Sequence, residues 1–367
     1  MAKRSGRRST LRARNRIRDK HNKDEQTRAK SWAREWLDAI LFALIAAIII
    51  RAFFIEAYRI PSPSMEQTLL TGDFLLVSKM HYGARTPMTI GVPFTNIYLR
   101  GVELPSFRLP GFTDIDRDDI VVFNYPVDRQ TVSRKTNYIK RATGIPGDTL
   151  TIQNKRFIRN GEMEDIRPTF EHEYRVEVAE ERRLSSSRVR EAGGQITRTE
   201  GDDYLINMTK KVQDEIMGWR EVEDIYLNVW PESLNQFGQI RFDFASAFNG
   251  NYHNMGPFIV PREGLELDLT DEDQNVEVYR EVIERFEGNE LEINGGEIMI
   301  NGEPADSYTF NQDYYFMVGD SRDNSEDSRF WGFVPEDHIV GRAVIIYFSW
   351  DSERIMPRFS RIFNLIH

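Results

Sequence analysis

The apolar run from Leu37 to Ile55 constrains the fold more than any other stretch of this 367-residue chain. As a helix, a segment of this length spans roughly 28 Å, which is close to the hydrocarbon thickness of a bilayer. Asp38 and Arg51 lie near its two ends, where charged side chains reach the membrane interface, and two tryptophans precede it. We therefore expect one transmembrane anchor, over residues 36–57.

The charge of the chain is divided at this run. Residues 1–35 form a basic arm with thirteen Lys and Arg against four Asp and Glu, a net charge of +9, whereas the remainder carries −19. The positive-inside rule then predicts a single-pass protein with a cytoplasmic N-terminus and everything after about Tyr58 outside. The absence of cysteine excludes disulfides, thiolate metal ligands and a cysteine nucleophile, and it agrees with an extracytoplasmic location.

Three other interpretations compete with an anchor. An arginine-rich arm can bind nucleic acid, but its position directly before the apolar run argues against a nucleic-acid partner. A removable signal peptide remains an alternative, although no convincing Ala-x-Ala site follows before Pro61. A buried globular helix fits poorly with the flanking charges.

The segment from Ile60 to Asp73 follows the anchor and begins with prolines and serines in alternation. Pro61 and Pro63 each fix a φ angle and remove a backbone donor, so the segment should be stiff and non-helical. In an extended segment, Ser62 and Ser64 point to one face. Such a pair can supply a nucleophile and a hydrogen-bond donor; a proline-rich spacer beside the membrane is the alternative.

Lys140 lies in a predicted strand, residues 136–143, which ends at a Gly-Ile-Pro-Gly turn. In a strand, Lys140 and Arg141 point to opposite faces of the sheet, so they cannot serve the same site. A lysine in an apolar site loses solvation of its ammonium form, so its pKa falls and it can act as a general base near neutral pH. An ordinary solvated lysine is the alternative. Further strands are predicted over 74–78, 119–123 and 341–349.

Residues 157–302 are acidic and contain no pattern of site chemistry. Short alternating runs predict strands, and Asn-Gly pairs at 294 and 301 predict hairpins. Helical spacing predicts two helices, from Asp203 to Met217 and from Thr270 to Gly288. We interpret this region as an inserted, mostly-β accessory subdomain.

The stretch from Tyr315 to Pro335 places charged and polar residues between two apolar segments. Its aspartates and arginines predict an ion-pair network around a tight turn. A calcium loop is the rival interpretation, but the interleaved arginines and the lack of an EF-hand glycine and glutamate pattern argue against it. We expect neither a metal nor a cofactor.

Four blocks, in order behind the anchor, resemble bacterial type I signal peptidases, the membrane-anchored serine–lysine endopeptidases of the S26 class. The matching blocks are Ile60–Met65 with Thr68, Leu69, Gly72 and Asp73; Asp119–Phe123; Tyr138–Asp148; and Gly319–Pro335 with Gly341–Ala343. They cover most of 56–150 and 308–350, whereas the arm and the insertion match little.

The resemblance implies a mainly β fold, with an antiparallel, coiled and partly barrel-like sheet behind one N-terminal transmembrane helix. An exposed apolar edge of that sheet would dip into the outer leaflet. The expected domains are the basic arm (1–35), the anchor (36–57), a catalytic β domain in two parts (58–156 and 303–367) and the inserted subdomain (157–302).

The resemblance also implies roles for individual residues. Ser64 matches the nucleophile and Lys140 the general base, and the Ser64 amide with the Ser62 hydroxyl matches the oxyanion hole. The supporting positions are Ser325, which orients the lysine amine, the ion pair of Asp327 and Arg329, and Arg141 with Asp320, which join two blocks. The residues that match the walls of the small, apolar S1 and S3 pockets are Ile60, Pro61, Met65, Leu69, Tyr138 and Ile139.

Two positions depart from the family pattern. Gln67 stands where the family usually has proline, which could loosen the turn after Ser64. Ser321 ends the sequence Gly319-Asp320-Ser321, where the family usually has Gly-Asp-Asn, so one turn cap is expected to be weaker. Neither change removes a reacting group.

The expected activity is removal of N-terminal signal peptides from exported preproteins after small residues (Ala-x-Ala), at the bacterial cytoplasmic (inner) membrane. Expected partners are those signal peptides, the lipid bilayer and the secretion translocon, and the mechanism needs no histidine. A penicillin-recognising Ser-x-x-Lys site is disfavoured, because Gln67 lies three residues after Ser64. A non-catalytic, membrane-anchored β-rich adaptor and a self-cleaving serine–lysine regulator remain alternatives.

Overall fold

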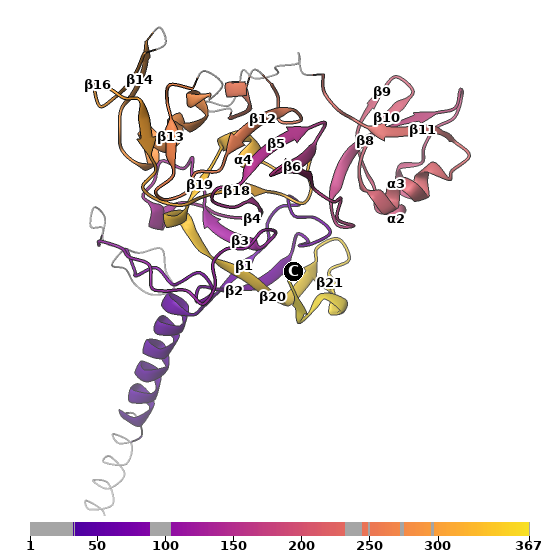
Figure 1. Cartoon of the computed structure of the whole chain (residues 1–367). Coiled ribbons are helices and arrows are strands. Elements are labelled where there is room, and N and C mark those ends of the chain that lie inside the picture. Colours follow the sequence, from indigo (N-terminus) through magenta and orange to yellow (C-terminus); the bar gives the residue numbers. More distant parts are fainter. Residues whose placement is uncertain are drawn as a thin grey trace, which may run out of the picture.

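The N-terminal helix stands apart from the rest of the chain (Figure 1). A computed structural model describes residues 32, 34–88, 104–231, 244–248, 250–271, 275–294 and 297–366. In it, Arg34–Phe53 is a helix long and apolar enough to cross a membrane, with a mean hydropathy of 2.2. The helix ends before Ile55, because Ile55 pairs with Ser78 at the start of the first strand. Most of the basic arm lies outside the described residues.

The largest sheet of the described chain has nine strands, all paired antiparallel, in the order β1-β2-β20-β3-β4-β18-β19, with β21 and β22 also on β20. Its strands are β1 (Ile55–Arg59), β2 (Asp73–Ser78), β3 (Ile120–Asn124), β4 (Asn137–Gly144), β18 (Tyr314–Val318), β19 (Val334–Pro335), β20 (Ile339–Asp351), β21 (Met356–Pro357) and β22 (Asn364–Leu365). The register shifts between β2 and β20, β20 and β3, and β18 and β4. Such bulges bend strands and increase twist, so the sheet curls into a half-barrel. The predicted mainly antiparallel β fold is confirmed.

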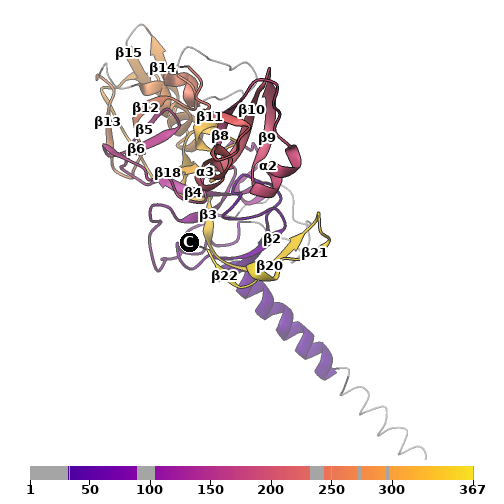
Figure 2. The ribbon, with the colours of Figure 1, turned by 90° about the vertical axis from the view of Figure 1, so that its right-hand side faces the viewer.

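A separate four-stranded sheet, in the order β11-β8-β10-β9, lies to one side of the large sheet (Figures 1 and 2). Its elements are β8 (Glu171–Val178), β9 (Gln195–Glu200), β10 (Asp203–Thr209), β11 (Val222–Leu227) and the helices α2 (Ser186–Ala192) and α3 (Lys210–Met217). The two helices pack on this sheet, and together they enclose a core that includes Val176, Ile206 and Ile216. This unit therefore has apolar packing of its own.

The remaining sheets surround the largest apolar cluster, which includes Phe157, Phe258 and Phe316. One sheet has the order β12-β5-β6-β7, and the others are β13-β17 and β14-β15-β16. Their bounds are β5 (Thr149–Gln153), β6 (Arg156–Arg159), β7 (Glu162–Met163), β12 (Met255–Ile259), β13 (Glu266–Asp268), β14 (Leu291–Asn294), β15 (Glu297–Ile300), β16 (Glu303–Pro304) and β17 (Ser307–Thr309). Both predicted Asn-Gly hairpins are present, between β14 and β15 and between β15 and β16. Since the first of these sheets spans residue 157, the domain boundaries stay a prediction.

Of the two long helices predicted in the insertion, the first is wrong over its first half, and the second is present in its described part with irregular helical geometry. Residues 203–209 form β10, whose side chains are buried against β8 and β9, and only residues 210–217 are helical, with the Thr209 side chain as the N-cap. In the second, residues 276–286 are helical without a break, beginning as a 3₁₀ turn (Val276–Tyr279) and ending as a π turn (Val282–Phe286) before Gly288. Burial of the apolar face was predicted correctly in both segments, whereas in the first segment tertiary packing overrode the local helical pattern.

The other short helical elements lie in turns of the large sheet and its neighbours. They are η1 (Val132–Arg134), η2 (Phe244–Phe248), α4 (Ser328–Trp331), η5 (Glu336–His338) and η6 (Phe359–Arg361). Of these, α4 is the next element after β18. The charged stretch between them packs against the loop between β1 and β2, where Ser321 N donates to Ser64 O. The candidate site lies at this contact.

Candidate active site

The loop that carries Ser64 joins β1 to β2 and is closed at its base. Ile60 N donates to Asp73 O at 2.8 Å, and Gly72 N donates to Ile60 O at 3.0 Å. After the Pro-Ser-Pro-Ser segment, Leu69 N donates to Met65 O at 2.7 Å, which closes a tight turn directly after Ser64, with Gln67 at a φ of +69°. The prolines before Ser64 and this tight turn after it leave Ser64 at a bend of the backbone.

Lys140 lies in β4, a strand paired on both sides by β3 and β18. Its side chain is 3% exposed, and Nζ lies 2.7 Å from Ser64 Oγ. Burial lowers the pKa of Lys140 to about 8, although the nearby carboxylates of Asp327 and Glu326 oppose the shift. About a tenth of the amine is therefore neutral at pH 7, within hydrogen-bond distance of one hydroxyl.

The geometry around Ser64 also includes two donors for an anionic oxygen. Ser62 Oγ lies 3.5 Å from Ser64 Oγ, so the two hydroxyls face the same side. Within the described part of the chain, the Ser64 amide donates no hydrogen bond. A backbone N–H and a hydroxyl that converge beside a nucleophile can stabilise a tetrahedral oxyanion.

The segment after β18 packs directly against the Ser64 loop. Ser321 N donates to the carbonyl oxygen of Ser64 at 3.2 Å. A Cβ on Gly319 would lie 2.6 Å from that same carbonyl oxygen and would collide with the Ser325 side chain. Ser325 Oγ is buried and has no hydrogen-bond partner among the described residues. The structure thus brings Ser325 beside the Ser64 loop, without a hydrogen bond to the lysine amine.

Asp327 and Arg329 form a fully buried ion pair under this segment. Arg329 Nη2 and Nε contact the two carboxylate oxygens of Asp327, each at 2.8 Å. Asp327 also accepts from Gly319 N at 3.0 Å and from Arg329 N, which makes it the N-cap of α4. Although burial alone would raise it, the Arg329 guanidinium and the Gly319 amide hold the pKa of Asp327 below its ordinary value.

Arg141 makes contacts different from those of Lys140. Its guanidinium binds both carboxylate oxygens of Asp320, at 2.8 and 2.6 Å, and Asp320 also accepts from Thr68 Oγ1 at 2.6 Å. Arg141 Nη1 donates to Asp118 O at 2.7 Å. One buried pair therefore joins β4, the turn after β18 and the Ser64 loop.

The residues expected to shape the substrate pockets divide into two groups. Ile60, Met65 and Leu69 are buried in one apolar cluster, and Ile139 packs against its edge. Tyr138 is half-buried and stacks on Tyr125, with ring centroids 4.4 Å apart. Pro61 is exposed. In sequence, apolar side chains thus flank Ser64 on both sides, and Tyr138 and Ile139 directly precede Lys140.

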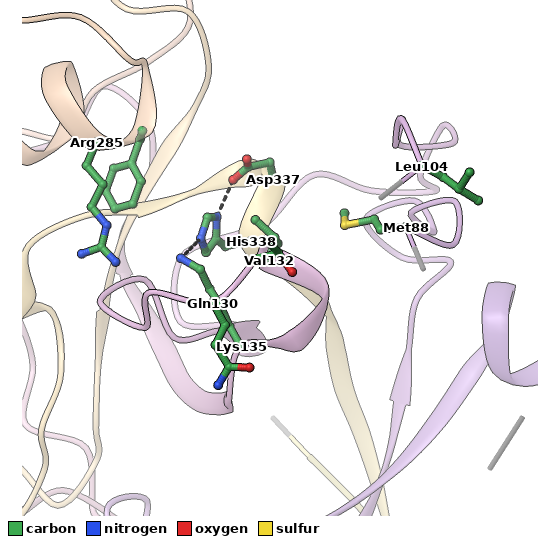
Figure 3. A pocket seen from close by; sticks show the side chains of 10 residues that line it. Met88, Leu104, Gln130, Val132, Lys135, Arg285, Asp337 and His338 are labelled. Atoms are coloured by element: carbon green, nitrogen blue, oxygen red, sulfur yellow. Dashed lines mark hydrogen bonds and ion pairs between the residues drawn. The ribbon is translucent and has the colours of Figure 1, made fainter. Parts of the chain in front are cut away.

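A distinct cavity of about 310 Å³ lies elsewhere and includes neither Ser64 nor Lys140 (Figure 3). In it, Lys135 Nζ lies 2.8 Å from His338 Nε2 and 3.0 Å from Pro126 O, and the other ring nitrogen of His338 contacts Asp337. Burial also lowers the pKa of Lys135 to about 8. The chain therefore has a second buried amine of low pKa, whose contacts in the described residues include no nucleophilic hydroxyl.

Sequence reasoning missed Glu171 and Asn207, which lie in the insertion and reach the Ser64 region. Glu171 Oε1 accepts from Gln67 Nε2 at 2.7 Å, and Asn207 Nδ2 donates to the other carboxylate oxygen at 3.0 Å. Neither residue belongs to a motif, and no local signal could have found them. Among the described residues, no group of three or more His, Asp or Glu side chains forms a metal site.

Known proteins match this chain over most of its length. The family model of signal peptidase, peptidase S26, matches residues 33–214 and 306–350. Signal peptidase I of Haemophilus influenzae is 30% identical, over 93% of this chain and 79% of the relative. Signal peptidase I of Pseudomonas aeruginosa is 26% identical over 88% and 76%, and that of Aquifex aeolicus is 24% identical over 88% of both. Together with the curled antiparallel sheet and the ordered sequence blocks, these matches establish that the chain belongs to the signal peptidase family, peptidase S26.

Proposed function

We propose that this chain is a serine endopeptidase that removes N-terminal signal peptides from exported preproteins after small residues, with Ser64 as nucleophile and Lys140 as general base. The observation that carries the proposal is the 2.7 Å distance between Lys140 Nζ and Ser64 Oγ at a nearly solvent-free position. The relatives named Signal peptidase I support the same reaction.

The reaction begins when neutral Lys140 takes the proton of the Ser64 hydroxyl as Ser64 Oγ attacks the scissile carbonyl carbon. The resulting oxyanion is stabilised by the Ser64 amide and the Ser62 hydroxyl, where loss of one donor costs on the order of a hundredfold in rate. The Lys140 ammonium then protonates the leaving amine. Neutral again, Lys140 activates water to hydrolyse the acyl-enzyme.

The residues around the catalytic pair have supporting roles in this proposal. The buried pair of Asp327 and Arg329 holds the turn that carries Ser325, and Arg141 with Asp320 fixes β4 against the Ser64 loop. The apolar side chains of Ile60, Met65 and Leu69, which share one buried cluster, would form the walls of small S1 and S3 pockets. Pro61, Tyr138 and Ile139 complete these walls.

The proposed site of action is the outer face of the bacterial cytoplasmic membrane, with Arg34–Phe53 as the anchor and the arm in the cytoplasm. The C-terminal segment supports a second membrane contact, because it exposes a group of large apolar side chains. They are Ile355, Met356, Phe359, Phe363 and Leu365. In both views, β20 and β21 lie on the same side of the molecule as the helix (Figures 1 and 2).

The test is cleavage of a preprotein with an Ala-x-Ala site by the detergent-solubilised full chain. We expect cleavage by the unmodified protein, and a loss of about a thousandfold or more in Ser64→Ala and Lys140→Ala. Lys211→Ala, at an exposed lysine of α3, is the matched control and should keep full activity. An unmodified protein that cleaves nothing would favour the non-catalytic adaptor, and full activity in Ser64→Ala would remove the mechanism.

A further inference from the structure

The carboxylate of Glu171 joins three separate segments beside the nucleophile. Glu171, the first residue of β8, is 5% exposed. Its Oε1 accepts from Gln67 Nε2 at 2.7 Å, and its Oε2 accepts from Ser321 Oγ and from Asn207 Nδ2, each at 3.0 Å. Asn207 lies in β10, so two strands of the separate four-stranded sheet contribute to the cluster.

Two of the three donors are at the positions where this chain departs from the family pattern. Gln67 replaces the usual proline, and its φ is +69°. Proline is locked near −65°, so it could not adopt this backbone, and any residue with a Cβ is disfavoured there. Ser321 stands where the motif Gly-Asp-Asn is usual, and its hydroxyl donates to the same carboxylate. The two departures are therefore coupled through Glu171.

Each of these donors is connected to Ser64 by a short path. Gln67 lies three residues after Ser64, in the turn that sets the direction of the nucleophile. Ser321 N donates to the Ser64 carbonyl oxygen at 3.2 Å. The backbone of Glu171 reinforces the contact, since Glu171 N donates to Asp320 O at 3.0 Å and Arg322 N donates to Glu171 O at 2.8 Å. Glu171 thus contacts both the turn after Ser64 and the segment that donates to the Ser64 carbonyl oxygen.

We propose that Glu171 is a positioning residue for Ser64, and that the β8–β11 sheet of the insertion orders the nucleophile turn through it. The inference rests on the proposed function of Ser64 and deepens it. A carboxylate suits this place because it accepts three hydrogen bonds and donates none. The Gln67–Glu171 hydrogen bond in turn stabilises the positive φ of Gln67, a backbone conformation that glutamine disfavours without such a contact.

The experiment reverses the donor and acceptor of the Gln67–Glu171 pair. Gln67→Glu places two carboxylates against each other, whereas the double variant Gln67→Glu with Glu171→Gln restores one hydrogen bond and the total charge. The readouts are kcat and KM of the detergent-solubilised full chain with an Ala-x-Ala peptide, and the thermal midpoint of each variant. Gln153→Glu, at an exposed glutamine of β5, controls for the added charge.

We expect kcat of Gln67→Glu to fall about tenfold to a hundredfold, because small displacements of a nucleophile have effects of this size. KM should stay within about threefold, and the double variant should recover most of the lost kcat. Gln153→Glu should behave as the unmodified protein.

Two results would overturn the inference. One is full kcat in Gln67→Glu; the other is a loss of kcat that follows the fraction of folded protein and is not recovered in the double variant. Failure of the proposed function looks different, because then the unmodified protein would not cleave, or Ser64→Ala would cleave as well as the unmodified protein.

Discussion

The guanidinium of Arg141 and the carboxylate of Asp320 form a bidentate pair, with both side chains no more than 1% exposed. Removing one partner of such a pair leaves an uncompensated buried charge. We therefore predict that Asp320→Ala lowers the free energy of unfolding by about 3–5 kcal/mol. Denaturant unfolding of the full chain in detergent measures this loss.

The matched control is an exposed pair. Lys210 and Asp214 lie four residues apart on α3, with side chains 51% and 61% exposed. Lys210→Ala should change stability by less than about 0.5 kcal/mol. Equal effects of the two substitutions would contradict the structural role given to Arg141 and Asp320.

Gly319 is predicted to tolerate no side chain. Its backbone lies against the Ser64 carbonyl oxygen and Ser325, so a methyl group would push the two segments apart. Gly319→Ala should lower stability by about 1–3 kcal/mol and reduce kcat. Gly218→Ala is the control, since φ is −77° there and the nearest atom to an added Cβ would be Glu215 O, at 3.3 Å. Normal activity in Gly319→Ala would argue against close packing at the nucleophile.

The pH dependence of cleavage follows from the protonation state of Lys140. Only the neutral amine acts as a base, and its fraction rises with pH through the pKa of about 8. The value of kcat/KM should therefore rise about tenfold per pH unit below that value and level off above it. A rate that is level from pH 6 to 8, or that still rises at pH 10, is inconsistent with this base.

The C-terminal apolar group is predicted to enter the membrane. Because the chain has no cysteine, Phe363→Cys allows one fluorophore to be attached at a side chain that is 72% exposed. In vesicles that contain the full chain, spin-labelled lipids should quench this fluorophore. Lys211→Cys, on α3, should remain unquenched; equal quenching at both positions would refute a specific contact.

Much of the site could be predicted because its signals are local. The alternation of Pro and Ser before Met65 indicated a stiff, non-helical segment. The strand around Lys140 was predicted from its own residues, whereas the role of Lys140 came from the family resemblance, because a solvated lysine fitted the local pattern equally well. The Gln67–Glu171 contact spans 104 residues and has no local signal. The change from strand to helix at Thr209 also has no local signal, because β10 is buried on both faces and therefore lacks a period-two pattern.

The departures at Gln67 and Ser321 were visible in the sequence, but their meaning was not. Each was expected to weaken a turn. In the structure, both side chains donate to one buried carboxylate from a different part of the chain. Pairwise compensation of this kind depends on tertiary contacts and cannot be derived from local propensity.

A lysine general base at Ser64 is tested by titration of the Lys140 amine by NMR, in full-length protein with ¹³C-labelled lysine side chains. Lys140→Met identifies its signal, which is necessary because the pKa of Lys135 is also lowered to about 8. We expect Lys140 to titrate near pH 8. A midpoint near the ordinary value of 10.5 would contradict a lysine general base at Ser64.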